Sequence, residues 1–258
     1  MANTAKYLYF ASDFHLGAPD ASTSAERERT LLHWLQEIEH SAHSIFLLGD
    51  IFDFWFEYKT VIPKGYVRLL GKLAQLADNG IQIHFFKGNH DMWMFDYFEK
   101  ELGVQIHHDD YQFEYQGKHF FLHHGDGLGP GDYNYKFLKL FFRSPICQWL
   151  FARLHPNFGI GLASFLSRRS RAKGGKKDQV YKGPEQEWLF QYVKAQQANL
   201  HQDYYLFGHR HLPLDLPVGT SKYINTGDWL KYNTFAVYDN SELRLMQWKD
   251  GKIIPYAG

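Results

Sequence analysis

The sequence predicts an α/β fold in which the strands of open sheets alternate with helices. Short apolar runs that fit strands alternate with longer stretches of helical spacing. In addition, most of the apolar runs in the first half of the chain end abruptly in a polar cluster. Ligands of open α/β sheets bind along the rim where the carboxyl ends of the strands meet. The pattern therefore predicts one site at that rim.

In the first half of the chain, three predicted strands each lead into such a cluster. A strand over 6–11 runs into Ser-Asp-Phe-His, and a strand over 44–48 runs into Gly-Asp-Ile-Phe-Asp. A third strand, over 81–87, stops in Gly-Asn-His-Asp. The segments between them, 26–39 and 63–78, have helical spacing.

The second half continues with a predicted hairpin over 111–126 that turns at Gln116-Gly117-Lys118 and ends in His-His-Gly-Asp. A helix over 184–198 then leads to a strand over 204–207, which Gly-His-Arg-His follows. Three more strands are predicted near the end of the chain, over 223–225, 234–238 and 242–248.

Composition restricts the class of protein. A chain of 258 residues, 45% of them hydrophobic, can bury a sizeable core, and its length fits one large domain or a domain with an insertion. The net charge is zero and favours no particular partner. Cys147 is the only cysteine, so an internal disulfide is excluded. Apolar runs are too short for a signal-peptide core or a transmembrane helix, and we expect no export.

Each polar cluster also has an ordinary interpretation when it is taken alone. Asp-x-His after a strand is typical of a turn, and Gly-Asp-Ile-Phe-Asp fits a loop with a helix-capping aspartate. Gly-Asn-His-Asp is less ordinary, because a turn does not need the imidazole. Gly-His-Arg-His is the least ordinary, since its two histidines can reach one site from a single loop. The joint occurrence of the clusters favours a shared site.

The clusters, in this order, resemble the five-part pattern of the calcineurin-like metallophosphoesterases. The resemblance covers about residues 6–230 and implies two mixed β-sheets sandwiched between helices, in the order αββα. It also implies a pair of divalent metal ions per chain. The matching residues are Asp13 and His15, Gly49 to Asp53, Gly88 to Asp91, His124 to Asp126, and Gly208 to His211.

The resemblance implies seven metal ligands. Carboxylate, imidazole and amide oxygen suit manganese, iron or zinc, of which we expect manganese, and Cys147 takes no part. Asp50 is implied to bridge both ions. One ion would be bound by Asp13, His15, Asp50 and His211, and the other by Asp50, Asn89, His124 and His209.

The same resemblance implies catalytic roles for His90 and Asp91. The nucleophile would be hydroxide, His90 would stabilise the transition state or the leaving group, and Asp91 would orient His90. A core histidine satisfied by Asp91 is the alternative for His90. Asp53, Asp91 and Asp126 are candidate partners of the ligating or catalytic imidazoles. His123 is expected to point away from its neighbour His124, because strand side chains alternate.

Residues 132–182, called the insertion below, stand out within what we expect to be a single domain over 1–258. They contain eleven basic and two acidic residues, a net charge of +9, together with many large apolar residues. A charge run is usually a solvated face and apolar helical spacing usually means core. Here both occur between two metal motifs, so we expect a helical insertion over the active site.

The insertion and the whole chain resemble a branch of this family, the UDP-2,3-diacylglucosamine diphosphatases of lipid A synthesis. That implies hydrolysis of UDP-2,3-diacylglucosamine to UMP and lipid X. The best-known members of the branch carry arginine where this chain has His90, and polar residues near Gly174 and Gly175. The implied substrate-binding residues are Asn89, His90, Asp132, Tyr135, Arg171 and His209.

Two alternatives stay open. A nucleotide phosphodiesterase or nuclease would use the basic insertion to grip a nucleic-acid backbone, and a non-catalytic scaffold would keep the fold alone. In the preferred interpretation the partner is a lipid-linked nucleotide, with no nucleic acid. The protein would be cytoplasmic, with peripheral contact at the inner membrane. Four aromatic residues are expected to help form an acyl chamber: Phe141, Phe142, Trp149 and Phe151.

Overall fold

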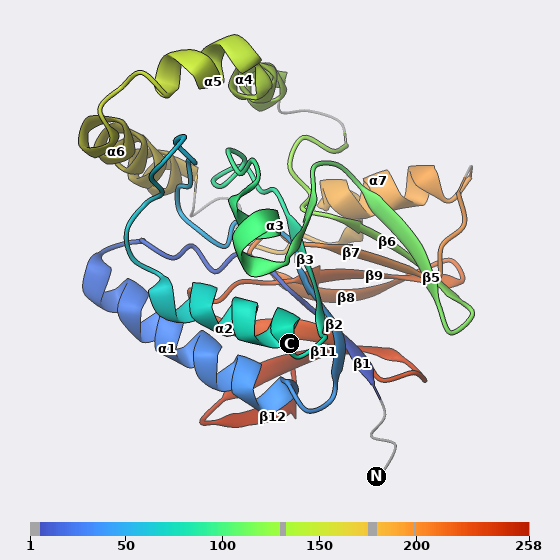
Figure 1. Ribbon diagram of the computed structural model, residues 1–258. Coiled ribbons are helices and arrows are strands. Elements are labelled where there is room, and N and C mark those ends of the chain that lie inside the picture. The colour runs from blue at the N-terminus through green and yellow to red at the C-terminus, as the bar shows by residue number, and fades with distance from the viewer. Residues whose placement is uncertain (1–5, 130–132, 175–179, 199, 258) are drawn as a thin grey trace.

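Two mixed β-sheets pack face to face at the centre of the protein (Figure 1). The structure is a computed structural model, and it describes residues 6–129, 133–174, 180–198 and 200–257. The seven-stranded sheet has the order β12-β11-β10-β1-β2-β3-β4, and the five-stranded sheet has the order β5-β6-β7-β9-β8.

Parallel strands form the middle of each sheet. The strands β1 to β4 pair in parallel, as do β6, β7 and β9, whereas β10 to β12, β5 and β8 are antiparallel additions. The strand bounds are β1 Tyr7–Ala11, β2 Ala42–Leu47, β3 Gln82–Phe86, β4 Gln105–His107, β5 Tyr111–Tyr115, β6 Lys118–His123, β7 Tyr204–Phe207, β8 Pro213–Val218, β9 Ser221–Thr226, β10 Thr234–Tyr238, β11 Leu243–Lys249 and β12 Lys252–Pro255.

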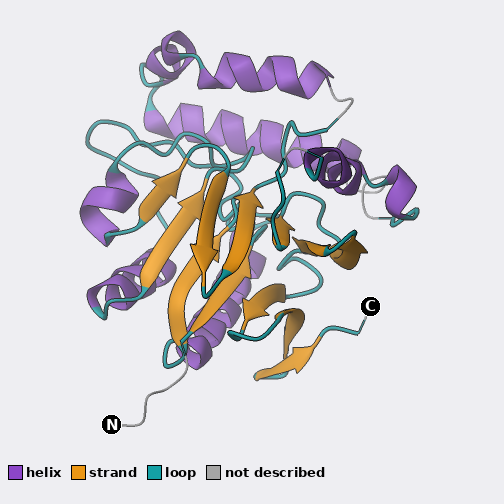
Figure 2. Cartoon of the chain, turned by 90° about the vertical axis from the view of Figure 1, so that its right-hand side faces the viewer, coloured by secondary structure: helices purple, strands orange, loops and turns teal. Residues whose placement is uncertain are grey.

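Helices cover the outer faces of both sheets, as predicted for an αββα sandwich (Figures 1 and 2). Apolar side chains of α1, α2 and α3 pack on the seven-stranded sheet, and those of α7 pack on the five-stranded sheet. The helix bounds are α1 Ala21–Ile38, α2 Val67–Asp78, α3 Tyr97–Leu102, α4 Tyr133–Arg143, α5 Pro145–Phe151, α6 Pro156–Gly174, the 3-10 turn η1 Pro184–Gln186 and α7 Trp188–Gln196.

The helices α4, α5 and α6 lie apart from these two layers, at the top of Figure 1, on the side where β1, β2 and β3 end. They belong to the insertion, whose described residues are thus mainly helical. No helix in the described part of the chain combines the length and the apolar composition that a membrane span requires.

Aromatic rings fill the space between the two sheets. Phe10 of β1 stacks on Phe46 of β2 at 4.9 Å between ring centres and reaches Phe120 of β6 at 6.0 Å. Phe113 of β5 extends this stack, at 4.9 Å from Phe120. The alternate residues of β1, such as Tyr9, belong instead to the cluster under α1. Because β1 is covered on both faces, it is apolar without alternation.

Some boundaries differ from the sequence prediction. α1 begins at Ala21 rather than at 26, because the Asp20 side chain caps it by accepting a hydrogen bond from the Thr23 backbone N–H. α2 begins at Val67 rather than at 63, after Tyr66, whose φ of 57° lies outside the helical region.

Four elements were not predicted: α3, β4, β8 and β12. β8 contains two prolines, Pro213 and Pro217, which are rare in strands. It forms an edge of the five-stranded sheet, where a missing N–H does not interrupt the ladder.

Candidate metal centre

The polar loops that follow β1, β2, β6 and β7 are joined to one another by backbone hydrogen bonds. Asp13 N–H donates to the Gly49 carbonyl at 3.0 Å, and Gly208 N–H donates to the His124 carbonyl at 2.9 Å. His209 N–H then donates to Asp13 Oδ2 at 2.9 Å, which links the two sheets. The strand ends therefore converge on one site, as predicted, and hydrogen bonds from backbone N–H groups hold their loops together.

Glycines permit this close approach. A Cβ at Gly88 would lie 2.1 Å from Asp50 Oδ1, and a Cβ at Gly208 would lie 2.6 Å from Asp13 Oδ2, so neither position accepts a side chain. Unusual backbone conformation is concentrated here as well, and such strain is typical of functional sites. The non-glycine residues with positive φ in these loops are Asp13, His15, Asp50, His209 and His211.

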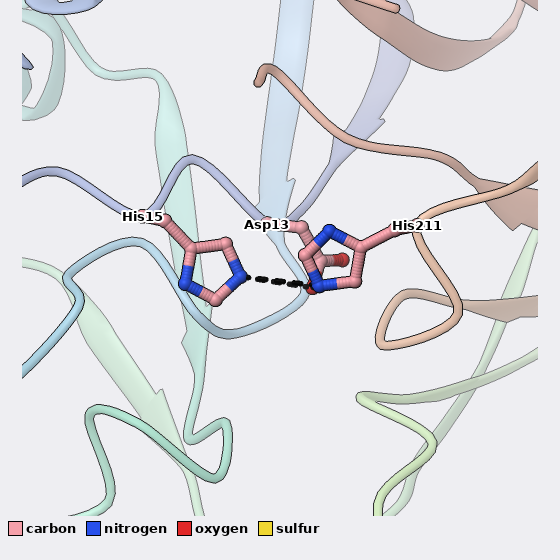
Figure 3. Close-up of side chains that lie close together, drawn as sticks. All are labelled: Asp13, His15 and His211. Carbon is pink, nitrogen blue, oxygen red and sulfur yellow. Dashed lines mark hydrogen bonds and ion pairs between the residues drawn. The ribbon is translucent and has the colours of Figure 1, made fainter. Parts of the chain in front are cut away.

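Asp13, His15 and His211 form a first group that can hold a cation (Figure 3). The Nε2 atoms of the two histidines lie 3.3 Å apart, and Asp13 Oδ1 lies 3.4 Å from His211 Nε2 and 3.7 Å from His15 Nε2. Ligands at about 2.1 Å from a tetrahedral ion are roughly 3.4 Å from each other. Asp13 Oδ1 is buried and has no hydrogen-bond partner within the described residues, as expected of an oxygen that serves as a metal ligand.

A second group consists of Asp50, His124 and His209, with Asn89 beside it. Asp50 Oδ2 lies 3.4 Å from His124 Nε2, and Asn89 Oδ1 lies 3.2 Å from the same nitrogen. Asn89 Oδ1 is also 2.9 Å from His209 Nδ1. Asp50 Oδ2 is 3.7 Å from His15 Nε2 of the first group, so this carboxylate lies between the two groups. The structure thus brings together all seven predicted ligands.

Hydrogen bonds outside the two groups orient the imidazoles. His211 Nδ1 donates to Asp228 Oδ2 at 3.1 Å, and His124 Nδ1 donates to the Leu48 carbonyl at 2.7 Å. These acceptors direct the Nε2 lone pair of each neutral ring toward the candidate ions. Asp228 was not predicted. It follows β9 in the segment Asn-Thr-Gly-Asp, so the search for polar residues after strands had the signal to find it.

The electrostatics favour ionised carboxylates. Burial alone would raise the pKa of Asp50, but the imidazoles of His124 and His90 hold it well below its usual range. Burial alone would lower the pKa of His124, but the Asp50 carboxylate raises it to about 10. A cation that enters such a site displaces protons from the histidines, so its binding is pH-dependent.

His90 lies at the edge of the two groups, and its ring centre is 4.9 Å from that of His15. Its Nδ1 is 3.2 Å from the Asp53 carbonyl oxygen and 2.9 Å from the hydroxyl of Ser167, which belongs to α6. Burial lowers the pKa of His90, which favours the neutral ring. The insertion therefore contacts the predicted catalytic histidine directly.

Asp91 does not have the partner that was predicted for it. Its Oδ2 accepts the Ile51 N–H at 2.7 Å and its Oδ1 accepts the Gly88 N–H at 2.8 Å, so the carboxylate joins two loops by their backbones. The carboxylate beside His90 is Asp53, at 3.7 Å from Nδ1. The expected orientation of His90 by Asp91 is corrected accordingly.

The two remaining candidates at the end of β6 also have defined partners. Asp126 forms an ion pair with Lys139 of α4 at 2.6 Å. His123 Nδ1 accepts a hydrogen bond from the Gly125 N–H at 2.7 Å, and the His123 ring lines a cavity beside the candidate metal centre. Both residues therefore lie next to the two groups of ligands rather than within them.

A buried ion pair supports the loop that carries His209 and His211. Arg210 Nε donates to Glu187 Oε1 at 2.9 Å, and its guanidinium stacks on Trp188 at 4.3 Å. Both charged residues are buried. The pair joins residues that are 23 positions apart, and the sequence offers no signal for it.

The insertion rests on the loops of the site. Trp93 Nε1 donates to the Phe142 carbonyl at 2.7 Å, and the Phe151 ring lies 4.7 Å from the Trp93 ring. Of the four residues expected in an acyl chamber, Phe142 and Phe151 thus pack on the protein, whereas Phe141 and Trp149 are exposed.

Three predicted substrate contacts fall outside what the structure describes. Asp132 lies outside the described residues. Tyr135 and Arg171 lie within the bounds of α4 and α6, but their side chains are outside the described part.

Comparison with known proteins gives sequence relatives named UDP-2,3-diacylglucosamine hydrolase. A UDP-2,3-diacylglucosamine hydrolase of Porphyromonas gingivalis is 40% identical over 256 residues, which cover 94% of this chain and 98% of the relative. A UDP-2,3-diacylglucosamine hydrolase of Edwardsiella ictaluri is 27% identical over 206 residues, which cover 79% of this chain and 75% of the relative. No family model matches the chain.

Among solved structures, YfcE, a phosphoesterase from E. coli, is 18% identical and has a TM-score of 0.47. The match covers 96% of each chain.

Proposed function

This chain belongs to the family of UDP-2,3-diacylglucosamine hydrolases, and we propose that it hydrolyses UDP-2,3-diacylglucosamine to UMP and lipid X, 2,3-diacylglucosamine 1-phosphate. The observation that carries the proposal is the 40% identity to a hydrolase of that name over 94% of this chain. A match of that extent includes the insertion as well as the strand ends. The converging Asp, His and Asn side chains agree with a hydrolase that cleaves a phosphoanhydride.

The proposed cofactor is a pair of divalent ions, with manganese as the expected metal. Asp13, His15 and His211 would hold one ion, with Asp50 shared between both, and the second ion would be held by Asn89, His124 and His209. Such ions, when bound, lower the pKa of a water molecule and neutralise charge on phosphate oxygens. The absence of a hydrogen-bond partner for Asp13 Oδ1 among the described residues supports a cation there.

His90 is the proposed catalytic residue that contacts the reacting phosphate. The Asp53 carbonyl can only accept a hydrogen bond, so Nδ1 carries the hydrogen in that contact and Nε2 is left for a substrate oxygen. An anionic phosphate beside the ring would favour its protonated form, which can donate from Nε2 and stabilise developing charge. Asp91 acts in this proposal as a positioning residue, through the backbone of the two loops that it joins.

The insertion is proposed to receive the acyl half of the substrate. Asn89, His90 and His209 would contact the phosphates, and Asp132, Tyr135 and Arg171 stay proposed contacts of the sugar phosphate. The insertion exposes an unusual number of large apolar side chains, which acyl chains could cover. They are Phe137, Leu140, Phe141, Ile146, Trp149, Leu150, Phe158, Leu162, Phe165, Leu166, Val180 and Tyr181.

Peripheral contact with the cytoplasmic face of the inner membrane is part of the proposal, because a diacylated substrate resides in a membrane. The basic residues Arg168 and Arg169 of α6 lie next to exposed Phe165 and Leu166 in the sequence. Apolar and basic side chains together are typical of surfaces that bind anionic lipid.

The decisive experiment incubates the purified protein with manganese and, separately, UDP-2,3-diacylglucosamine, a cyclic nucleotide and single-stranded DNA. We expect release of UMP and lipid X from the first substrate and slow or no turnover of the others. Asp50→Asn serves as the inactive reference, and Asp215→Asn, at an exposed aspartate of β8, serves as the matched control. Cleavage of DNA without cleavage of the lipid nucleotide would replace the proposal with a nuclease.

A chain-length series tests the acyl half separately. Each methylene removed from a fully buried acyl chain should weaken binding by up to about 0.8 kcal/mol. Catalytic efficiency that does not depend on chain length would contradict the role proposed for the insertion.

A further inference from the structure

A cavity of about 200 Å³ lies beside the candidate metal centre. Its walls come from the ends of β3, β4 and β6 and from α4 and α5 of the insertion, and they include the candidate ligand His124. Gly88, which precedes the candidate ligand Asn89, also lines it. A group held in this cavity would therefore adjoin a phosphate bound at the metal centre.

The walls are mostly polar. Of the fourteen lining residues, ten have polar or ionisable side chains, and the large apolar ones are Phe86, Met92 and Phe95. An acyl chain would remove these polar groups from water without offering them a hydrogen bond, which is costly. A hydrophilic part of a ligand suits the cavity better. Pockets for drug-sized ligands measure roughly 300–1,000 Å³, so this cavity would hold only part of a large substrate.

The cavity also carries a positive charge that no carboxylate contacts within the described residues. Arg143 pairs with Asp109 at 2.8 Å, and Lys139 pairs with Asp126 at 2.6 Å. Lys87 is the third cation on the walls, and within the described residues no carboxylate oxygen lies within 4.0 Å of its Nζ. An anionic group in the cavity would supply the missing partner.

Lys87 is held in place for such a role. Its Nζ donates a hydrogen bond to the Met94 carbonyl, which leaves further ammonium hydrogens for a ligand. The ring of Phe95, 39% exposed, lies beside it, with Nζ 5.9 Å from the ring centre. A cation next to an exposed aromatic face is an arrangement that suits a phosphate joined to a planar base.

We propose that this cavity binds the nucleoside monophosphate half of the substrate, with Lys87 on its phosphate and Phe95 against its base. The inference rests on the proposed function for the identity of the substrate. The two halves of the bound substrate would then extend from the metal centre in different directions. The nucleotide would lie on the side of His124, and the acylated half would lie on the side of His90 and Ser167.

The test measures binding of UMP and of lipid X to the manganese-loaded protein by calorimetry. In Lys87→Met we expect the dissociation constant of UMP to rise about tenfold or more, the loss of one charge-assisted contact. The affinity for lipid X should change less than about twofold. Lys87→Arg should keep most of the affinity for UMP. Lys100→Met, at an exposed lysine of α3 paired with Asp96, is the matched control and should bind both products like the wild type.

Two results would overturn the inference. UMP binding that is unchanged in Lys87→Met would show that the cavity does not take the nucleotide. An equal loss for UMP and lipid X, with metal content intact, would assign Lys87 to the shared phosphate position instead. A Phe95→Ala variant gives a second measure, because it should weaken UMP but not inorganic phosphate.

These measurements do not depend on turnover, so they separate the two proposals. UMP binding that depends on Lys87 in a protein that fails to hydrolyse the lipid nucleotide would refute the proposed function and support the cavity. Hydrolysis together with UMP binding indifferent to Lys87 would refute the cavity alone.

Discussion

The imidazole of His211 and the carboxylate of Asp228 are joined by a hydrogen bond of 3.1 Å from Nδ1 to Oδ2, and Asp228 is buried. The other oxygen of Asp228 accepts the Lys231 N–H at 2.8 Å, which fixes the carboxylate in turn. The histidine is thereby held with Nε2 toward Asp13 and His15. Because of these contacts we expect Asp228 to affect metal affinity although it is not a predicted ligand.

Asp228→Asn should therefore weaken metal binding by roughly 10–100-fold, the usual effect of removing such a partner. The measurement is a competition titration with a chelator of known affinity. Asp215→Asn, which removes an exposed carboxylate paired with Lys222, is the control and should bind metal like the wild type. Equal affinity in Asp228→Asn and the wild type would show that the hydrogen bond does not support the site.

Asp50→Asn should reduce the content of both metal ions, because one carboxylate oxygen lies between the two groups of ligands. The amide has nearly the same volume but no charge, so the fold should persist. Metal analysis of the purified variant, with circular dichroism to confirm the fold, measures the effect. Two ions per chain together with full activity would contradict the bridging role.

His90→Ala should leave the metal content largely intact and reduce turnover by roughly 10²–10⁴-fold, as for other positioned acid–base groups. The physical reason is that Nδ1 is occupied by the Asp53 carbonyl and Ser167, while the seven predicted ligands do not include His90. Steady-state kinetics and metal analysis on the same preparation decide the matter. Loss of the metals along with activity would mean that His90 is a ligand or a structural support.

We expect the free energy of unfolding to fall in mild acid because of His84 and His107. Their ring nitrogens lie 3.0 Å apart, and burial lowers the pKa of each to about 4, below the 6.5 of a free histidine. A group with a lowered pKa contributes stability that is fully present above pH 6.5 and is lost as the pH falls toward 4. The buried His84 should therefore cost about 2–3 kcal/mol of unfolding free energy between pH 7.5 and pH 4.5. The half-buried His107 should cost less, because solvent screens its charge.

His84→Phe tests this, since phenylalanine can keep the stacking on Phe46, whose ring centre is 4.5 Å away. Urea unfolding at about pH 7.5 and about pH 4.5 should show a smaller acid-induced loss in the variant than in the wild type. His40→Phe, at an exposed histidine, provides the comparison. An identical loss in all three proteins would assign acid sensitivity to other groups.

The exposed apolar residues of the insertion predict binding to anionic vesicles. Phe137→Ser with Leu140→Ser, both more than 70% exposed in the wild type, should reduce sedimentation with phosphatidylglycerol vesicles. Val67→Ser changes an equally exposed apolar residue of α2, outside the insertion, and should not reduce sedimentation.

Arg168→Gln with Arg169→Gln should remove about 1 kcal/mol of attraction per arginine near the surface, and this part should vanish at high salt. Sedimentation at low and high salt measures it. Vesicle binding that neither pair of substitutions alters would contradict membrane contact through the insertion.

The residues of the candidate metal centre could be predicted because their signal is local. Asp13, Asp50, Asn89, His124 and His209 each follow a strand within a few positions, and strand patterns can be recognised in the sequence. Once such strands lie side by side, their ends share one rim, so the convergence follows from topology rather than from the details of packing. The αββα architecture followed from a family resemblance that depends on the same residues.

Tertiary structure alone decided which side chains support that centre. The supporting hydrogen bonds join residues far apart in the sequence. The separation is 17 positions for Asp228 and His211, 23 for Glu187 and Arg210, 77 for Ser167 and His90, and up to 41 for Asp91 and its backbone partners. A hydrogen bond depends on distances of a few tenths of an ångström, and those distances are set by how helices and sheets pack.

The sequence by itself determined the chemistry at the strand ends, since the identities of ligating groups are properties of single residues. Packing decided the rest. It placed Asp53 rather than Asp91 beside His90, because the Asp91 carboxylate is occupied by the N–H groups of Ile51 and Gly88. In the part of the chain that the structure describes, it also left Lys87 without a carboxylate partner on the wall of a cavity. That wall is built from several segments, so the sequence next to Lys87 does not predict it.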